Sequence, residues 1–227
     1  MTPRAARPPP PAATALSRMA FDVRATHTVR LAAHLLRALP RLADGRRAVA
    51  SRLDVDDGAC GVHLSFDDGP APATTTALLD ALGGVRSTFF LLADAARAHP
   101  GLARRIADGG HHIGLHGPTH ADLWRTRFDD RAWDAARAEI EDASGNGLAA
   151  VRPPFGHLTP PLLGWARRAC LPVWLWDVMP GDFRPHATAA TVAATTRRLA
   201  RAGSVVVLHE GLAVADVVVP AVRRLVG

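Results

Sequence analysis

The sequence of 227 residues contains no lysine and no tyrosine, and it has only two cysteines. All 27 basic residues are therefore arginine, and against 21 acidic residues they give a formal net charge of +6. Cys60 and Cys170 cannot form a disulfide framework or a four-thiolate zinc site by themselves, and whether they bridge each other stays open. No apolar run reaches the roughly 18 residues that a membrane-spanning helix needs, so we expect a soluble protein.

The positive charge is the first feature that could indicate a nucleic-acid partner. A nucleic-acid-binding face needs clustered arginines on one face, ideally with aromatic residues between them. Here the arginines are scattered through nearly every helical pattern, with acidic residues between them. The sequence therefore predicts no nucleic-acid partner.

The amino-terminal part differs in texture from the rest of the chain. Residues 1–20 contain arginines and a proline run, which predicts a flexible lead-in. Residues 21–60 predict a helical segment packed on the main domain rather than on a membrane surface, because Arg30, His34 and Arg37 share one helical face. No uninterrupted apolar stretch follows the basic end, so we expect a cytoplasmic protein; a mis-assigned translation start would instead allow an extracytoplasmic one.

From residue 61 to residue 227, short apolar runs alternate with helical patterns. Strands are expected at 61–66, 87–92, 111–116, 149–152, 172–177 and 204–209. Helices are expected at 73–82, 100–108, 129–143, 160–169, 188–202 and 215–226. This alternation predicts an α/β fold of parallel units, either an open sheet or a barrel. Because polar residues gather at the carboxyl ends of the strands, we favour a distorted, incomplete (β/α) barrel with at most six strands.

Two adjacent carboxylates, Asp67 and Asp68, end an apolar strand and are followed by Gly69 and Pro70. Adjacent carboxylates repel each other, so a cation is expected near them, with one Asp as a metal ligand and the other free to act as a base. A helix cap or a turn accounts equally well for this segment taken alone.

Two imidazoles four residues apart, His116 and His120, follow another strand. On a helix or tight turn this spacing places both on one face, within reach of one metal ion, although solvated loop histidines would show the same spacing. One Asp and two His make a three-ligand set that leaves positions open for water, as in catalytic rather than structural metal sites.

Five motifs occur in the order and approximate spacing of one known family. They are Asp67-Asp68-Gly69-Pro70, His116 to His120, Arg152-Pro153-Pro154-Phe155-Gly156, Gly181-Asp182-Phe183 and Leu208-His209. On these motifs the chain resembles the NodB-like polysaccharide deacetylases, carbohydrate esterase family 4, over roughly residues 61–226. Each motif alone is modest evidence, but five in order at strand ends form a specific pattern.

The resemblance implies a metal centre and a base. Asp68, His116 and His120 would bind a divalent metal, usually zinc in this family. Asp67 would take a proton from the attacking water held by that metal. Arg152 would hold Asp67 in place and favour its ionised form.

The resemblance also implies an acid and a substrate pocket. The backbone N–H of Phe155 would stabilise the oxyanion. His209 would protonate the leaving amine, with Asp182 orienting it and raising its pKa. Phe155, Phe183 and Leu208 would be the substrate-binding residues.

The implied activity is hydrolysis of N-acetyl groups on a glycan, such as a chitooligosaccharide or a peptidoglycan amino sugar. Two alternatives stay open at this point. The same site could hydrolyse O-acetyl esters or cyclic imides, or the chain could be a catalytically silent carbohydrate-binding relative. The oligomeric state is left undetermined.

Several positions depart from the usual family text. Gly117 stands where Ser or Thr usually follows the first metal histidine, Met179 replaces an expected Asp, Phe183 replaces a pocket Trp, and Glu210 replaces a common Asp. Family members also normally continue into a strand after the final helix. In its absence the barrel edge could stay open, be covered by the amino-terminal segment, or be completed by a partner.

Overall fold

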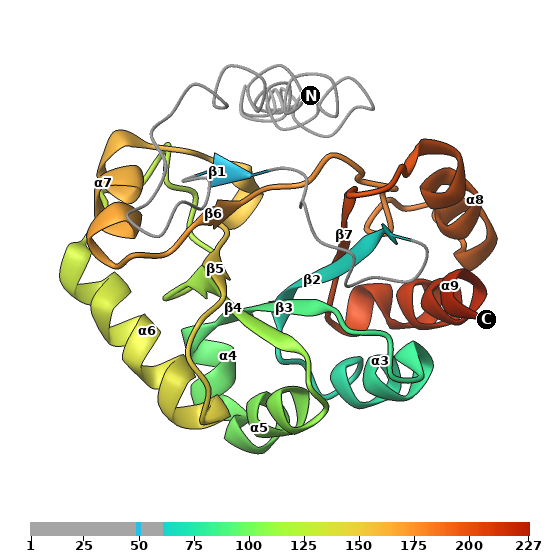
Figure 1. Cartoon of the computed structure of the whole chain (residues 1–227), viewed down its shortest axis with the longest axis horizontal. Coiled ribbons are helices and arrows are strands. Elements are labelled where there is room, and N and C mark those ends of the chain that lie inside the picture. The colour runs from blue at the N-terminus through green and yellow to red at the C-terminus, as the bar shows by residue number, and fades with distance from the viewer. Residues whose placement is uncertain (1–48, 51–60) are drawn as a thin grey trace, which may run out of the picture.

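The computed structural model, which describes residues 49–50 and 61–227, contains one curved parallel sheet with helices around its outside (Figure 1). The sheet has seven strands in the order β1-β6-β5-β4-β3-β2-β7. The strands are β1 (Val49–Ala50), β2 (His63–Gly69), β3 (Thr88–Leu92), β4 (His112–Gly117), β5 (Ala150–Val151), β6 (Val173–Trp174) and β7 (Val205–His209). The predicted incomplete (β/α) barrel is confirmed, but the expected maximum of six strands is wrong, because Val49–Ala50 add a seventh strand by pairing with β6.

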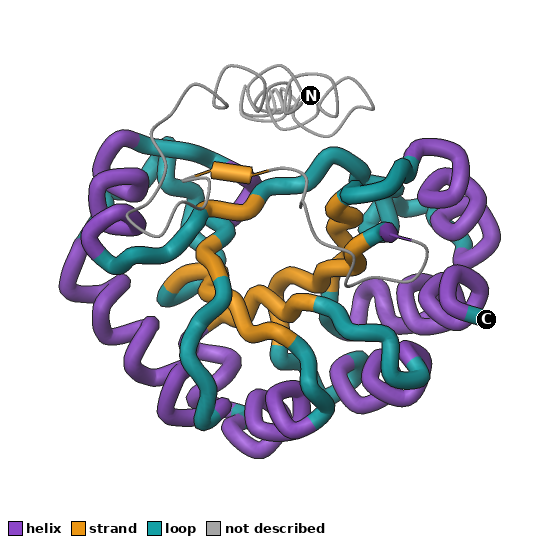
Figure 2. Tube along the Cα trace, viewed as in Figure 1, coloured by secondary structure: helices purple, strands orange, loops and turns teal. Residues whose placement is uncertain are grey.

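The helices form the outer layer and the strands the inner one (Figure 2). They are α3 (Thr75–Leu82), α4 (Ala93–Ala98), α5 (Pro100–Asp108), α6 (Asp130–Ser144), α7 (Pro160–Arg168), α8 (Ala189–Leu199) and α9 (Ala215–Val226), with the 3-10 turns η2 (Pro154–Gly156) and η3 (Leu212–Val214). Within the described ranges, no helix is both long and apolar enough to cross a bilayer. Every helix expected between residues 61 and 227 is present, and α4 is an additional one.

The core lies between the two layers and explains why these segments fold as they do. Every residue of β3 is buried, as expected for a parallel strand covered on both faces. On α6 the buried residues Trp133, Ala136 and Ile140 recur every three or four positions, so one stripe of the helix faces the sheet.

A close contact between β3 and β4 explains why residue 114 is a glycine. A Cβ added at Gly114 would lie 2.4 Å from the ring of Phe90. The missing side chain at Gly114 therefore leaves room for the Phe90 ring beneath the Arg152 guanidinium, whose Cζ is 3.9 Å from the ring centroid.

The two ends of the sheet approach each other through the segment that follows β6. The Leu175 N–H donates to the Ala50 carbonyl at 2.7 Å, next to β1. Three residues later, Val178 forms a parallel bridge with Val206 of β7. The outer edge of β7 is therefore covered by this segment.

Of the amino-terminal residues 1–60, the structure describes only Val49 and Ala50, so it tests the expectations for this part at those two residues alone. Val49–Ala50 pair in parallel with β6, so the prediction of a helical 21–60 segment is wrong at these two residues. The remainder of 21–60, together with 1–20, lies outside the described residues. Cys170 is a free, exposed thiol, and Cys60 also lies outside the described residues.

Candidate metal centre and active site

The residues singled out by the sequence motifs lie at the carboxyl ends of strands. Asp67 and Asp68 are near the end of β2, His116 is near the end of β4, Arg152 directly follows β5, and His209 ends β7. Parallel strands end at one edge of a sheet, so these side chains meet on a single face of the barrel.

Asp68, His116 and His120 form a cluster whose ligand atoms all lie within 4.8 Å of one another. The Nε2 atoms of His116 and His120 are 3.3 and 3.2 Å from Asp68 Oδ1. That oxygen is buried and has no hydrogen-bond partner among the described residues. One carboxylate oxygen and two imidazole nitrogens match a three-ligand zinc site with open positions, so the residues present fit a divalent cation.

The electrostatics of this cluster favour the deprotonated forms that bind metal. Burial raises the pKa of the Asp68 carboxyl, but the close contact with His116 and the charges of the nearby histidines outweigh burial and lower the pKa below 3.8. For His120, burial lowers the pKa, and the charge of Asp68 offsets only part of that effect. Both side chains could therefore take up a cation without first losing a proton at neutral pH.

The orientation of His116 is fixed by a second contact. Its Nδ1 lies 2.8 Å from the Arg152 carbonyl oxygen, so Nδ1–H donates there and the Nε2 lone pair faces Asp68. The following Gly117 has a φ of 115°, a conformation that a Ser or Thr would adopt only under strain. The departure from the family text at this position therefore coincides with a backbone conformation that favours glycine.

Asp67 is held by the buried Arg152. Arg152 Nη1 donates to Asp67 Oδ1 at 2.6 Å and to Ser65 Oγ at 2.9 Å. Its other nitrogens donate to the carbonyl oxygens of Trp174 and Leu175, both at 3.0 Å. Because Arg152 has 0% exposure, this network fixes the direction from which Asp67 faces the metal cluster.

His209 forms a second charged pair with Asp182. Its Nδ1 lies 3.1 Å from Asp182 Oδ1, and its backbone N–H donates to Asp182 Oδ2 at 2.7 Å. Burial by itself lowers the pKa of His209, but the Asp182 carboxylate, helped by Asp67 and Asp68, raises it to about 9. His209 is therefore protonated at neutral pH and can donate a proton.

The three expected substrate-binding residues differ in what they offer to a ligand. Phe155 is 40% exposed, has a φ of 58°, and meets His120 edge to face with ring centroids 4.5 Å apart. Phe183 is partly buried and stands edge-on to His209 at 5.1 Å. Leu208 has 0% exposure within the core cluster, so its side chain presents no surface to a ligand and supports β7 instead.

The motifs did not single out an exposed aromatic pair beside the metal cluster. Trp124, four residues after His120, is 68% exposed and stacks on His157 with centroids 3.6 Å apart. An exposed Trp is uncommon, but the exposure of Trp124 and its contact with His157 cannot be read from the sequence. The burial of the Glu210 carboxyl likewise has no signal in the sequence.

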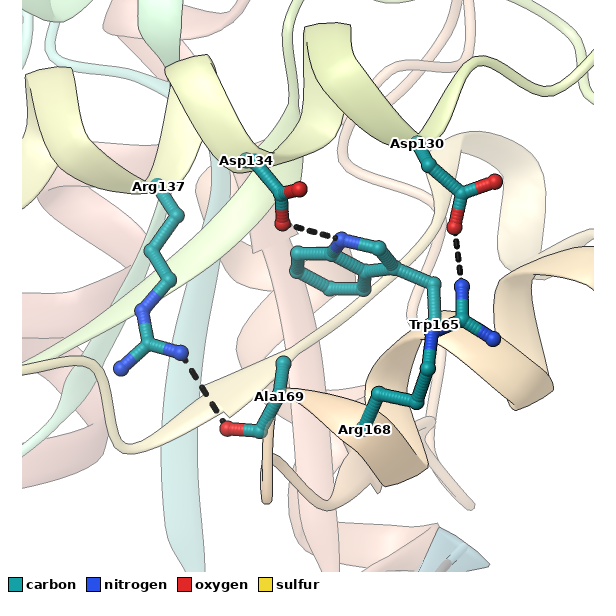
Figure 3. Close-up of a pocket in the computed structure, with 6 residues that line it drawn as sticks. All are labelled: Asp130, Asp134, Arg137, Trp165, Arg168 and Ala169. Atoms are coloured by element: carbon teal, nitrogen blue, oxygen red, sulfur yellow. Dashed lines mark hydrogen bonds and ion pairs between the residues drawn. The ribbon is translucent and has the colours of Figure 1, made fainter.

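A separate hollow of ≈ 370 Å³ lies between α6 and α7 and contains none of the residues above (Figure 3). Its polar side chains are largely paired with their neighbours: Trp165 Nε1–H donates to Asp134 at 2.8 Å, Arg137 donates to the Ala169 carbonyl at 3.2 Å, and Arg168 contacts Asp130. These contacts hold α6 against α7 and account for the polar residues that line the hollow.

Comparison with known proteins gives the same family from sequence and from structure. Residues 54–173 match the family model described as polysaccharide deacetylase. A chitooligosaccharide deacetylase of Sinorhizobium fredii is 33% identical over an alignment of 159 residues, with 68% of this chain and 74% of that protein covered.

Two solved structures extend the likeness to the whole fold. A peptidoglycan N-acetylglucosamine deacetylase superposes with a TM-score of 0.70 at 28% identity, covering 78% of this chain and 84% of the other. A family 4 carbohydrate esterase from Streptomyces lividans, solved with acetate, gives a TM-score of 0.65 at 28% identity, covering 74% and 88%.

Proposed function

Because the chain belongs to the polysaccharide deacetylase family, we propose that it removes N-acetyl groups from an oligosaccharide or polysaccharide of acetylated amino sugars. The observation that carries this proposal is that three groups of side chains lie together on one face of the barrel. They are the Asp68–His116–His120 cluster, the Asp67–Arg152 pair and the His209–Asp182 pair. The names of the relatives support chitooligosaccharide or peptidoglycan amino sugars as the substrate class.

Asp68, His116 and His120 are the residues that would hold the divalent cation, with zinc favoured by the nitrogen and oxygen donors. Such a cation, when bound, polarises an acyl oxygen and makes a water molecule more acidic. Nothing else in this chain offers a comparable set among the residues that the structure describes.

Asp67 is the proposed general base. Its Oδ1 is occupied by Arg152, while Oδ2 lies 3.9 Å from His116 Nε2, on the side of the metal cluster. The hydrogen bond from Arg152 holds Asp67 still, so that the free oxygen of its carboxylate can accept the proton of the water that attacks the acyl carbon.

His209 is the proposed general acid. The protonated imidazole, held by Asp182 on its Nδ1 side, donates from Nε2 to the amine nitrogen as the C–N bond breaks. Phe155 would contribute its backbone N–H to the oxyanion, and the positive φ of Phe155 is the kind of backbone strain found at functional sites. Acetate and a free amino sugar are the products.

Acetate release from N-acetylglucosamine oligomers tests this function. We expect release that is abolished by a chelator, restored by added zinc, and reduced at least about a hundredfold in Asp67→Asn. Parallel assays with an O-acetylated sugar and a cyclic imide identify any other acyl bond that the site prefers. Binding of the oligomer without release of acetate from any of these substrates would contradict the proposal and favour a silent binding relative.

A further inference from the structure

An exposed aromatic surface adjoins the metal cluster and has no role in the chemistry proposed above. Trp124 is 68% exposed, and its indole lies parallel to the His157 ring, with an interplanar angle of 3°. Since His157 covers one face of the indole, the exposed area belongs to the other face and the edges. We call Trp124 together with His157 the aromatic platform.

The platform is held rigid by polar contacts at both rings. The Trp124 Nε1–H donates to the Leu158 carbonyl at 3.3 Å, and its backbone N–H donates to Asp122 Oδ1 at 2.9 Å. The same Asp122 oxygen lies 2.6 Å from His157 Nδ1. A ring fixed in this way loses little conformational freedom when a ligand binds to it.

The platform is continuous with the metal cluster. The His157 ring lies 5.5 Å from the Phe155 ring, and the Phe155 ring lies 4.5 Å from His120. Phe155 is itself 40% exposed, so the row of rings leads over accessible surface from the metal ligand to Trp124. A short glycan with one sugar at the metal cluster could therefore reach the platform with another.

The chemistry of the platform suits a pyranose ring. One face of a pyranose carries C–H groups that can lie on the electron-rich face of an indole, and its hydroxyls project from the edge. Asp122 supplies a carboxylate beside the two rings, and a carboxylate accepts hydrogen bonds from hydroxyls.

We propose that the aromatic platform binds a second sugar ring of the substrate, so that the protein acts on oligomers in preference to a single acetylated sugar. This inference rests on the proposed deacetylase function for the identity of the ligand. It adds a recognition surface outside the reacting centre, with Trp124 as the specificity-determining residue.

The test compares Trp124→Ala and Trp124→Phe with the unaltered protein on N-acetylglucosamine and on its tetramer. We expect Trp124→Ala to lower kcat/KM for the tetramer about tenfold, mostly through KM, and to change kcat/KM for the monosaccharide less than about twofold. Trp124→Phe, which keeps an aromatic face, should recover most of the lost activity. Equal losses on both substrates, or no loss on the tetramer, would overturn the proposal.

Calorimetric titration of the same three proteins with the tetramer separates this proposal from the proposed function. Binding that weakens in Trp124→Ala supports the platform even where no acetate is released, in which case the deacetylase assignment alone fails. Binding that is the same in all three proteins overturns the platform whatever the activity. The thermal midpoints of the variants check that both are folded, as expected for a side chain that is mostly exposed.

Discussion

The charge of the buried His209 ring is set mainly by one carboxylate, that of Asp182. Burial alone would lower its pKa below 6.5, yet Asp182 and the more distant Asp67 and Asp68 raise it to about 9. Folding therefore gains free energy from the protonated ring below pH 6.5, and this contribution is lost as the pH rises through about 9. In the proposed mechanism the protonated His209 ring donates the proton that the leaving amine requires.

Asp182→Asn should shift the alkaline limb of the kcat/KM profile to lower pH. Without the carboxylate, burial is left as the dominant influence on His209, so its pKa falls and the acid form is lost earlier. We expect a shift of about one pH unit or more, together with a lower maximum. An alkaline limb that stays in place while only the maximum falls would show that His209 is not the titrating acid.

Arg152 shows how one side chain can join several strands. It follows β5, pairs with Asp67 and bonds to Ser65 on β2, and donates to the carbonyl oxygens of Trp174 and Leu175 at the end of β6. A lysine has the charge but a single nitrogen, so it cannot reproduce these bonds.

We therefore expect Arg152→Lys to lower the free energy of unfolding by about 3 kcal/mol or more and to lower kcat at least tenfold. Urea denaturation and steady-state kinetics measure the two effects. Arg168→Lys is the matched control, because Arg168 pairs with Asp130 at the surface and such pairs contribute about 0–1 kcal/mol. Equal effects of the two substitutions would contradict the role given to Arg152.

The role of a residue was predictable from the sequence where a motif contained residue types suited to one kind of chemistry. Residue types and strand-end positions grouped one Asp with His116 and His120, the resemblance selected Asp68, and the structure brings these three side chains together. Leu208 could not be judged from its motif, because adjacent residues of a strand face opposite sides and only the structure shows which side is filled by core. The Trp124–His157 stack joins two loops, so no local pattern reveals it.

At the scale of elements, Glu210 ties the end of β7 to the start of α3. Its Oε2 accepts hydrogen bonds from the Thr74 and Thr75 hydroxyls, and its backbone N–H donates to the Asp67 carbonyl at 2.9 Å. Burial raises its pKa from 4.5 to about 7, although the threonine hydrogen bonds act in the opposite direction. The Glu210 Oε1 atom is buried and has no hydrogen-bond partner among the described residues.

The stability of Glu210→Gln relative to the unaltered protein should therefore depend on pH. The folded state holds the Glu210 proton more tightly than the unfolded state, so the unaltered protein loses stability as the pH rises from about 4.5 through about 7. The glutamine variant lacks this loss. Between pH 4.5 and 8 we expect the difference in unfolding free energy to shift by about 3 kcal/mol in favour of the variant. A difference in urea denaturation that is the same at pH 5 and pH 8 would refute this assignment.

The order of strands and helices was largely predictable from apolar periodicity, but their lengths were not. β5 and β6 are only two residues long, within expected ranges of 149–152 and 172–177. An apolar run reports burial rather than pairing, and buried residues such as Leu175 and Trp176 continue beyond the end of β6. α4 was missed because it follows β3 without a loop and without a side-chain cap, so no sequence signal separates the two.

At the scale of the whole molecule, the curved sheet is closed by irregular backbone rather than by another regular strand. After β6 the chain crosses to β7, where Asp177 Oδ1 accepts the Val205 N–H and Oδ2 accepts the Ser204 hydroxyl, both at 2.9 Å. Val178 then bridges to Val206. The sequence raised the question of an uncovered sheet edge but could not answer it. The contacts that cover the edge join β7 to an irregular segment after β6, and that segment forms no regular strand of its own.

Asp177 anchors this closure and also begins the loop that carries Asp182. Asp177→Ala would leave the buried Val205 N–H and Ser204 hydroxyl without these acceptors, and each such loss costs about 1–3 kcal/mol. We expect the free energy of unfolding to fall by about 2–4 kcal/mol, with Asp177→Asn intermediate because its amide keeps one acceptor oxygen. Since the loop that positions Asp182 starts from this anchor, kcat/KM should fall in the same order.

Urea denaturation measures the loss, and Asp142→Ala on the exposed face of α6 is the control, with an expected change within about 0.5 kcal/mol. If Asp177→Ala were as stable as Asp142→Ala, the barrel would be held closed by the apolar contacts of the Trp176, Val205 and Val207 cluster instead. Closure through hydrogen bonds has a distinct consequence: the amide protons of Val205 and Val178 should exchange slowly in the unaltered protein and faster in Asp177→Ala, even under conditions where both proteins are folded.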